Sequence, residues 1–150
     1  MTTTANDAWE ALLSAHAALI KRFAAEDIWQ GLSMREYDVL YTLSKCPHPQ
    51  RIGELHRHVL LSQPALSRLV DRLVERGLLC RHTDPADRRG VRLSLTAAGR
   101  DLQRQVGRRH ARSVARALSG ELDAGELRRL ETICRKLAHD GPGTDKDPSS

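Results

Sequence analysis

The sequence contains few aromatic residues, so its core has to be built from aliphatic side chains. Phe, Trp and Tyr make up 3% of the 150 residues, whereas all hydrophobic residues together make up 40%. A chain of this length can form one domain with a sizeable core. A core of Leu, Val, Ile and Ala indicates a mainly helical protein.

Long apolar runs are also missing. No segment approaches the roughly 20 consecutive apolar residues of a membrane span. The opening residues, MTTTAND, lack the basic and apolar pattern of an export signal. We therefore expect a cytoplasmic protein with no membrane partner.

Cysteine is scarce and irregularly spaced. Cys46, Cys80 and Cys134 form no CxxC motif and are odd in number, which fits neither a disulfide framework nor a zinc site. We interpret them as buried, unreactive thiols.

Catalytic and metal-binding motifs are absent from the sequence as well. It contains no nucleophile elbow and no Gly-rich phosphate loop. His56, His58 and His110 do not have the spacing of a metal-ligand set. The sequence therefore predicts no enzyme, no metal site and no cofactor.

Positive charge is concentrated in the middle of the chain. Residues 51–116 carry fifteen arginines, no lysine and six acidic residues, a net charge of +9, whereas each flank has a net charge of −2. Such a block is typical of proteins that bind polyanions, of which nucleic acid is the commonest. A solvated, arginine-rich surface is the alternative interpretation.

Three helices are predicted before the most basic region. Apolar residues at helical spacing predict the first helix from Ala8 to about Trp29. A capping box at Ser33 opens the second, and a short third helix runs from about Ile52 to His58.

The segment from 62 to 77 is the best-defined helix of the sequence. Ser62 is its expected N-cap, Pro64 fits its first turn, and Gly77 ends it. One face is apolar and the opposite face is polar. Together with the preceding short helix, this segment predicts a helix-turn-helix whose second helix enters the major groove of DNA. Amphipathic surface helices are common, so this feature alone does not establish DNA binding.

Two antiparallel strands are predicted directly after this helix, over about 79–95. The segment VRLSL alternates apolar and polar residues, and DPADRRG before it has the composition of a turn. Arg88 and Arg89 lie at the tip, where arginine suits a narrow minor groove. A helix-turn-helix followed by such a hairpin is a winged helix.

Two further helices and a polar tail complete the chain. Thr96 caps a long helix that reaches about Leu118, and a capping box at Asp123 opens the last helix. The tail at 140–150 has no apolar content, so we expect it to be disordered.

The run from Ser62 to Gly99 resembles the MarR family of bacterial transcription regulators. It carries Asp87-x-Arg89 and then Leu95-Thr96-x-x-Gly99, which match the wing signature of that family. The segment RLVDRL followed by ERG also matches its recognition helix. The resemblance extends over roughly residues 7–139 in the order and length of the helices.

This resemblance implies one domain over 1–150, mainly α with a small β-hairpin wing (α+β). Residues 7–30 and 97–139 would form a helical dimerisation region, and 33–95 a winged helix-turn-helix. The implied protein is a homodimeric repressor that binds a pseudo-palindromic operator in double-stranded DNA. The implied half-sites lie about one helical turn apart. The apolar stripes of the first and last helices independently favour a partner surface.

The resemblance assigns DNA contacts by position. The recognition helix would bind through Ser62, Gln63, Pro64, Ser67, Arg68 and Arg72. Arg72 would contact a phosphate or pair with Asp71 or Asp87. Arg88 and Arg89 would share the wing contact, and the sequence does not decide which of them enters the minor groove. Asp87 would shape the wing.

Members of the family commonly bind a small aromatic or phenolic ligand that loosens DNA binding. Candidate ligand-binding residues are His16, Trp29, Tyr37, Tyr41 and Arg112, although each also fits a packing or surface role. Two alternative functions remain open, a winged-helix module for protein or RNA and a thiol-based redox sensor that uses Cys46, which lies near His48.

Overall fold

The computed structural model describes residues 2–84 and 86–139, and within the wing it describes no side chain for Asp84, Asp87, Arg88 or Arg89. Pro85 and the expected tail at 140–150 lie outside the described residues. The chain divides into two compact units, one up to Ser113 and one from Val114. The elements are α1 (Ala5–Ala24), α2 (Met34–Ser44), β1 (Gln50–Arg51), α3 (Ile52–His56), α4 (Gln63–Glu75), β2 (Leu79–Asp84), β3 (Asp87–Leu95), α5 (Ala97–Ser119) and α6 (Ala124–Ala138).

Helix N-termini follow the local signals of the sequence. Ser33 and Asp123 form the predicted capping boxes. Each side chain accepts a hydrogen bond from the backbone N–H of the glutamate at N3, and the carboxylate of that glutamate accepts one from the backbone N–H of the capping residue. Thr4 forms a third box with Asp7. Carboxylates in these first turns also lie favourably in the helix dipole.

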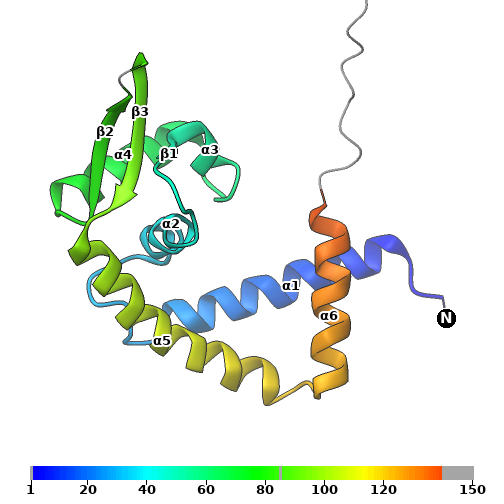
Figure 1. The fold of residues 1–150 in the computed structure, drawn as a ribbon. Helices are drawn as coiled ribbons and strands as arrows, with labels where there is room; N and C mark the ends of the chain where they lie inside the picture. The colour runs from blue at the N-terminus through cyan, green and yellow to red at the C-terminus, as the bar shows by residue number, and fades with distance from the viewer. Residues whose placement is uncertain (1, 85, 140–150) are drawn as a thin grey trace, which may run out of the picture. The chain divides into compact units, whose positions relative to one another are not determined.

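The expected hairpin forms part of a three-stranded antiparallel sheet with the order β1-β3-β2 (Figure 1). Leu79 pairs with Leu95 and Cys80 pairs with Ser94, so the strand predicted over 91–95 is confirmed. The short strand β1 was not predicted, because two residues are too few to show a strand period. Gln50 of β1 pairs with Leu93 on the edge of β3 that faces away from β2.

The core of the first unit lies between the helices and one face of this sheet. α4 packs against β2 and α2 packs against β3. Its large fully buried apolar side chains are aliphatic, as the composition predicts, and include Val39, Leu40, Leu55, Leu66 and Leu73. The mainly helical fold with a β-hairpin wing is therefore confirmed.

The first helix is shorter than the sequence predicts, since α1 ends at Ala24 and not near Trp29. The chain then turns back, with positive φ at Gln30 and Gly31. The indole Nε1 of Trp29 donates a hydrogen bond of 2.9 Å to the carbonyl oxygen of Phe23. The same carbonyl also accepts a hydrogen bond of 3.1 Å from the backbone N–H of Glu26, so the indole is a second donor to the end of the helix.

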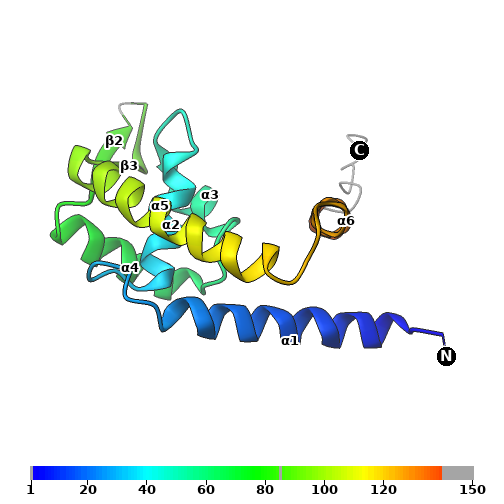
Figure 2. The same cartoon turned by 90° about the horizontal axis from the view of Figure 1, so that it is seen from below.

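Two helices carry apolar side chains that remain exposed. On α1 these are Trp9, Leu12, Leu13 and Ile20, and on α6 they are Leu130, Ile133 and Leu137. Figure 2 shows α1 as a long helix close to the N-terminus. No helix within the described residues is long and apolar enough to cross a membrane.

Candidate nucleic-acid interface

Helix α4 has one buried apolar face and one exposed polar face. Leu66, Leu69, Val70 and Leu73 are its buried residues. Ser62 caps the helix, since its Oγ accepts a hydrogen bond of 3.3 Å from the backbone N–H of Ala65.

The residues predicted to contact DNA through the recognition helix all lie on the polar side of α4 or at its N-cap. Ser67 is half-buried, and the other five are exposed, namely Ser62, Gln63, Pro64, Arg68 and Arg72. Small side chains at the start of the helix leave its N-terminal end able to approach another surface closely. The structure therefore brings this set together on one accessible face.

An ion pair joins α4 to the wing. The guanidinium of Arg81 on β2 contacts the carboxylate of Asp71 on α4. Arg72 has no ion-pair partner among the described side chains, so its guanidinium is available at the surface. The sequence had offered Asp71 as a partner of Arg72, but Asp71 pairs with Arg81 instead.

The backbone of the hairpin reaches beyond the helices next to it, as Figure 1 shows for β2 and β3. Its register shifts between Thr83 and Asp84, close to the tip. The side chains of Asp87, Arg88 and Arg89 lie outside what the structure describes, so their predicted roles remain predictions. The backbone places all three at the start of β3.

Two arginines that the sequence analysis did not single out lie beside the wing. These are Arg51 and Arg57. They line a hollow together with Glu54 and with Gly90 and Val91 of β3. The only signal for them in the sequence was their place in the basic block, because the hollow forms when β1 pairs with β3.

A side-chain hydroxyl connects the end of α4 to the start of α5. The Oγ1 of Thr96 donates a hydrogen bond of 2.6 Å to the carbonyl oxygen of Gly77. The same oxygen accepts a hydrogen bond of 3.0 Å from the backbone N–H of Gly99. A Cβ at Gly99 would lie 2.0 Å from the carbonyl oxygen of Leu78, so this close approach requires glycine.

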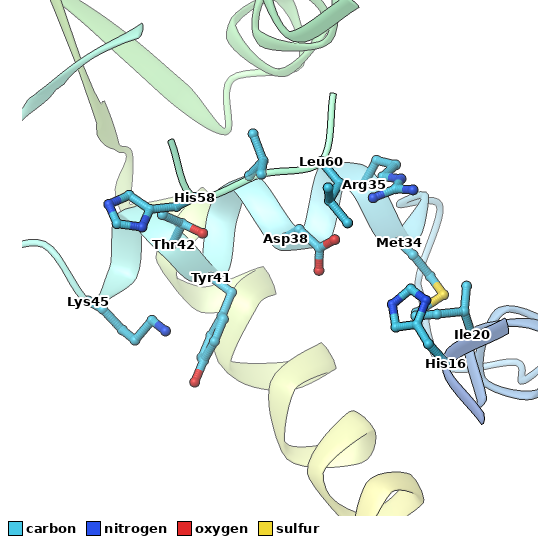
Figure 3. A pocket seen from close by; sticks show the side chains of 11 residues that line it. His16, Ile20, Met34, Arg35, Asp38, Tyr41, Thr42, Lys45, His58 and Leu60 are labelled. Atoms are coloured by element: carbon cyan, nitrogen blue, oxygen red, sulfur yellow. The ribbon is translucent and has the colours of Figure 1, made fainter. Parts of the chain in front are cut away.

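A groove of about 320 Å³ opens between α1, α2 and the segment after α3 (Figure 3). His16 and Tyr41 line it, and they come from the predicted ligand-binding set. The amine Nζ of Lys45 lies 4.1 Å from the centre of the Tyr41 ring, a cation–π distance. The other polar residues of the lining are Arg35, Asp38, Thr42 and His58.

The comparisons with known proteins agree with this geometry. Residues 30–90 match the model of the MarR family. The chain is 26% identical to AbsC, a MarR family transcriptional regulator from Streptomyces coelicolor, with a TM-score of 0.78 over 92% of this chain and 95% of AbsC. It is 25% identical to a second regulator of this family from S. coelicolor, solved in complex with DNA, with a TM-score of 0.79 over 92% and 89%. Residues 30–90 are thus similar to the MarR family, and the fold over 92% of the chain is similar to that of two regulators of this family.

A third similar structure bears on ligand binding. PcaV, a transcriptional regulator from S. coelicolor solved in complex with its natural ligand, is 27% identical to this chain. The TM-score is 0.68 over 92% of this chain and 97% of PcaV. All three similar structures are of transcriptional regulators.

The other residues of the predicted ligand-binding set do not line the groove. Trp29 and Tyr37 are buried, with ring centres 5.5 Å apart, and both rings contact His110. Arg112 is exposed on α5. The Tyr41 ring nevertheless stacks on the Tyr37 ring, with ring centres 6.0 Å apart, so Tyr41 connects the groove to the buried aromatic pair.

Burial changes the acid–base behaviour of this aromatic cluster. It lowers the pKa of His110, which Asp38 and Glu26 partly oppose by their negative charge. Burial likewise raises the pKa of Tyr37, although a hydrogen bond with Gln103 acts in the other direction. Both effects favour the neutral form of each side chain.

Cys46, the thiol that the sequence predicts as the candidate for redox sensing, lies just beyond the C-terminal end of α2. The Sγ of Cys46 donates a hydrogen bond of 3.3 Å to the carbonyl oxygen of Thr42, one turn earlier. No imidazole among the described residues is within hydrogen-bond distance of this sulfur. Cys80, which the sequence analysis treated as inert, lies instead beside His82.

Proposed function

We propose that this chain represses transcription by binding a specific sequence of double-stranded DNA. The observation that carries the proposal is the exposed polar face at the N-terminal half of α4, opposite a buried apolar face. Gln63 and Arg68 lie on that face. The guanidinium of arginine matches the O6 and N7 acceptors of guanine, and the amide of glutamine matches N6 and N7 of adenine.

The wing and its surroundings supply the electrostatic part of this binding. Arg88 or Arg89 enters the minor groove next to the site of α4, while Asp87 shapes the tip. In this proposal Arg51, Arg57 and Arg72 contact phosphates, and such contacts position a protein on DNA without reading its sequence. The net charge of +9 over residues 51–116 supports this role.

The protein acts as a homodimer in this proposal. The exposed apolar side chains of α1 and α6 support it, because a monomer would leave them in water. Two symmetry-related copies of α4 then meet two half-sites of a pseudo-palindromic operator. Those half-sites lie about one helical turn, roughly 10 base pairs, apart.

A small ligand releases the protein from its operator. The groove beside Tyr41 supports binding of a small aromatic or phenolic anion, because Arg35, Lys45 and two histidines supply positive or hydrogen-bonding groups around one aromatic ring. Its volume of about 320 Å³ suits a small molecule.

The DNA-binding proposal is tested by selecting bound duplexes from a random pool with the purified full-length protein. We expect enrichment of a palindromic motif with half-sites about 10 base pairs apart. Recovery of duplexes without a common motif would contradict the proposal. A single-stranded RNA pool in parallel tests the alternative of an RNA-binding module, which predicts enrichment there instead.

The ligand proposal is tested by thermal shift and by release from the selected duplex, with benzoate and phenol as probes. Stabilisation that is lost in Lys45→Met and Tyr41→Ala supports the groove as the site. A matched Lys21→Met substitution, at an exposed position outside the groove lining, should leave the shift unchanged. Binding that survives both groove substitutions would contradict the assignment.

A further inference from the structure

Three polar side chains form a closed cluster on the wing. The Sγ of Cys80 lies 3.3 Å from Nε2 of His82 and 3.2 Å from Oγ of Ser94. Nε2 of His82 lies 2.6 Å from the same Ser94 oxygen. Each member of the cluster therefore contacts both of the others.

The pairing of β2 with β3 brings these residues together. Cys80 pairs directly with Ser94, and His82 lies two residues further along β2 on the same face. The opposite face carries Leu79 and Leu93, which are buried in the core. The cluster is thus on the outer face of the sheet, where His82 is exposed and Cys80 is half-buried.

We propose that Cys80 is a nucleophilic thiol that small hydroperoxides oxidise to a sulfenic acid. The His82 imidazole is within reach of the thiol proton, and a nucleophile beside a base that a third group orients is the geometry of an activated nucleophile. Once formed, the thiolate receives hydrogen bonds from the imidazolium Nε2–H and from the Ser94 hydroxyl. Arg92, which is paired with His82 across the strands, adds positive charge to the same face.

The oxidation needs only the Cys80 thiol, the His82 imidazole and the hydroperoxide. The Cys80 thiol gives its proton to His82, and the thiolate sulfur attacks the terminal oxygen of the hydroperoxide. The sulfur–oxygen bond forms as the oxygen–oxygen bond breaks, and the leaving alkoxide or hydroxide takes the proton from His82. Sulfur is oxidised by two electrons, the peroxide is reduced to an alcohol or water, and cellular thiols can reverse the product.

The other two cysteines provide a comparison within the same molecule. Cys134 is exposed on α6, and its thiol has no hydrogen-bond partner among the described residues. The Cys46 thiol donates its hydrogen bond to a backbone carbonyl and not to a side-chain base. Exposure alone would make Cys134 the most reactive thiol, whereas activation by an imidazole selects Cys80. This inference does not depend on the proposed DNA binding.

The test measures sulfenic acid at each cysteine of the reduced full-length protein. Hydrogen peroxide is added at pH 7 with dimedone as the trapping reagent, and labelled peptides are quantified by mass spectrometry over time. We expect Cys80 to be labelled at least about tenfold faster than Cys134, as for a thiol whose thiolate is stabilised. This comparison needs no substitution, so it is independent of any folding defect.

Two variants separate activation from simple exposure. His82→Gln keeps the side chain polar but removes the base, and it should slow labelling of Cys80 about tenfold. His48→Gln is the matched control at another exposed histidine and should leave the rate unchanged. A Cys80 rate no greater than that of Cys134 would overturn the proposal, and so would an unaltered Cys80 rate in His82→Gln.

Discussion

The hydroxyl of Thr96 lies 2.6 Å from the carbonyl oxygen of Gly77, so one side chain joins the end of α4 to the start of α5. Gly77 has a φ of +75°, the left-handed conformation in which α4 ends. The backbone N–H of Gly99 bonds to the same hydroxyl oxygen, which caps α5. This contact fixes how the chain leaves the proposed recognition helix and wing and enters the long helix.

Thr96→Ala removes both hydrogen bonds of this junction. We expect a loss of about 1–2 kcal/mol in the free energy of unfolding, the range for a lost N-cap. Urea denaturation followed by circular dichroism measures it. Thr132→Ala is the control, because the hydroxyl of Thr132 bonds only to the carbonyl of Arg128 on its own helix. An equal effect of both substitutions would show that the junction has no special role.

Gly99→Ala tests the close approach of α5 to the end of α4. The added Cβ would lie 2.0 Å from the carbonyl oxygen of Leu78, and a backbone atom cannot move aside cheaply. We expect destabilisation of at least about 1–3 kcal/mol, as for overpacking. Gly53→Ala is the matched control in a helix, since its Cβ would meet nothing within 4 Å. It should be neutral or stabilising by up to about 1 kcal/mol.

Arg68→Ala should reduce affinity for the selected operator by about 1–3 kcal/mol and relax the preference at one base-pair position. Arg89→Ala should weaken binding more evenly across sequences, because a minor-groove arginine responds to groove width. Fluorescence anisotropy with the operator and its single base-pair variants measures both. Small, equal effects of the two substitutions would contradict the roles that we assign.

Ile133→Glu places a charge on the apolar face of α6, where the side chain of Ile133 is 54% exposed. If this face is a dimer interface, the buried charge is costly and the variant should sediment as a monomer at micromolar concentration. Leu60→Glu is the control at an apolar side chain that is 74% exposed outside α1 and α6. A wild-type protein that already sediments as a monomer would contradict the homodimer.

The stability of the fold should fall as the pH is lowered below about 6.5, the ordinary pKa of histidine. Burial lowers the pKa of His110 in the folded chain, so the unfolded chain binds this proton at a higher pH. The contribution of His110 to stability is therefore fully present above about pH 6.5, the pKa in the unfolded chain. It is lost as the pH falls from there through the lower pKa of His110 in the folded chain. His110→Phe should flatten this decline in urea midpoints measured from pH 7 to pH 5. The exposed-site variant His48→Asn should decline like the wild type, and a decline that persists in His110→Phe would exclude His110 as its cause.

Local signals explain why much of the fold could be predicted. The capping boxes at Ser33 and Asp123 and the strand over 91–95 involve residues close in sequence, and the structure has all of them. The end of α1 could not be predicted in this way. The bond from Trp29 to Phe23 that accompanies the turn depends on how the indole packs in the core.

Features that combine distant segments were the ones that sequence reasoning missed. The cluster around Cys80 requires the register that pairs Cys80 with Ser94, and the sequence pattern alone left this thiol among the inert ones. The groove likewise needs α1 to lie beside α2, which is why Lys45 was not singled out. The recognition-helix set was accessible to sequence reasoning because all of its members lie on one face of a single helix or at its N-cap.

The ratio of two dissociation constants tests sequence-specific DNA binding most directly. The purified full-length protein is titrated at one salt concentration with the selected operator and with a scrambled duplex of the same length and composition. We predict that the operator binds at least about 10³-fold more tightly, as expected for specific recognition. A ratio near one would contradict the account, because it would leave only the general attraction of a basic surface for phosphates.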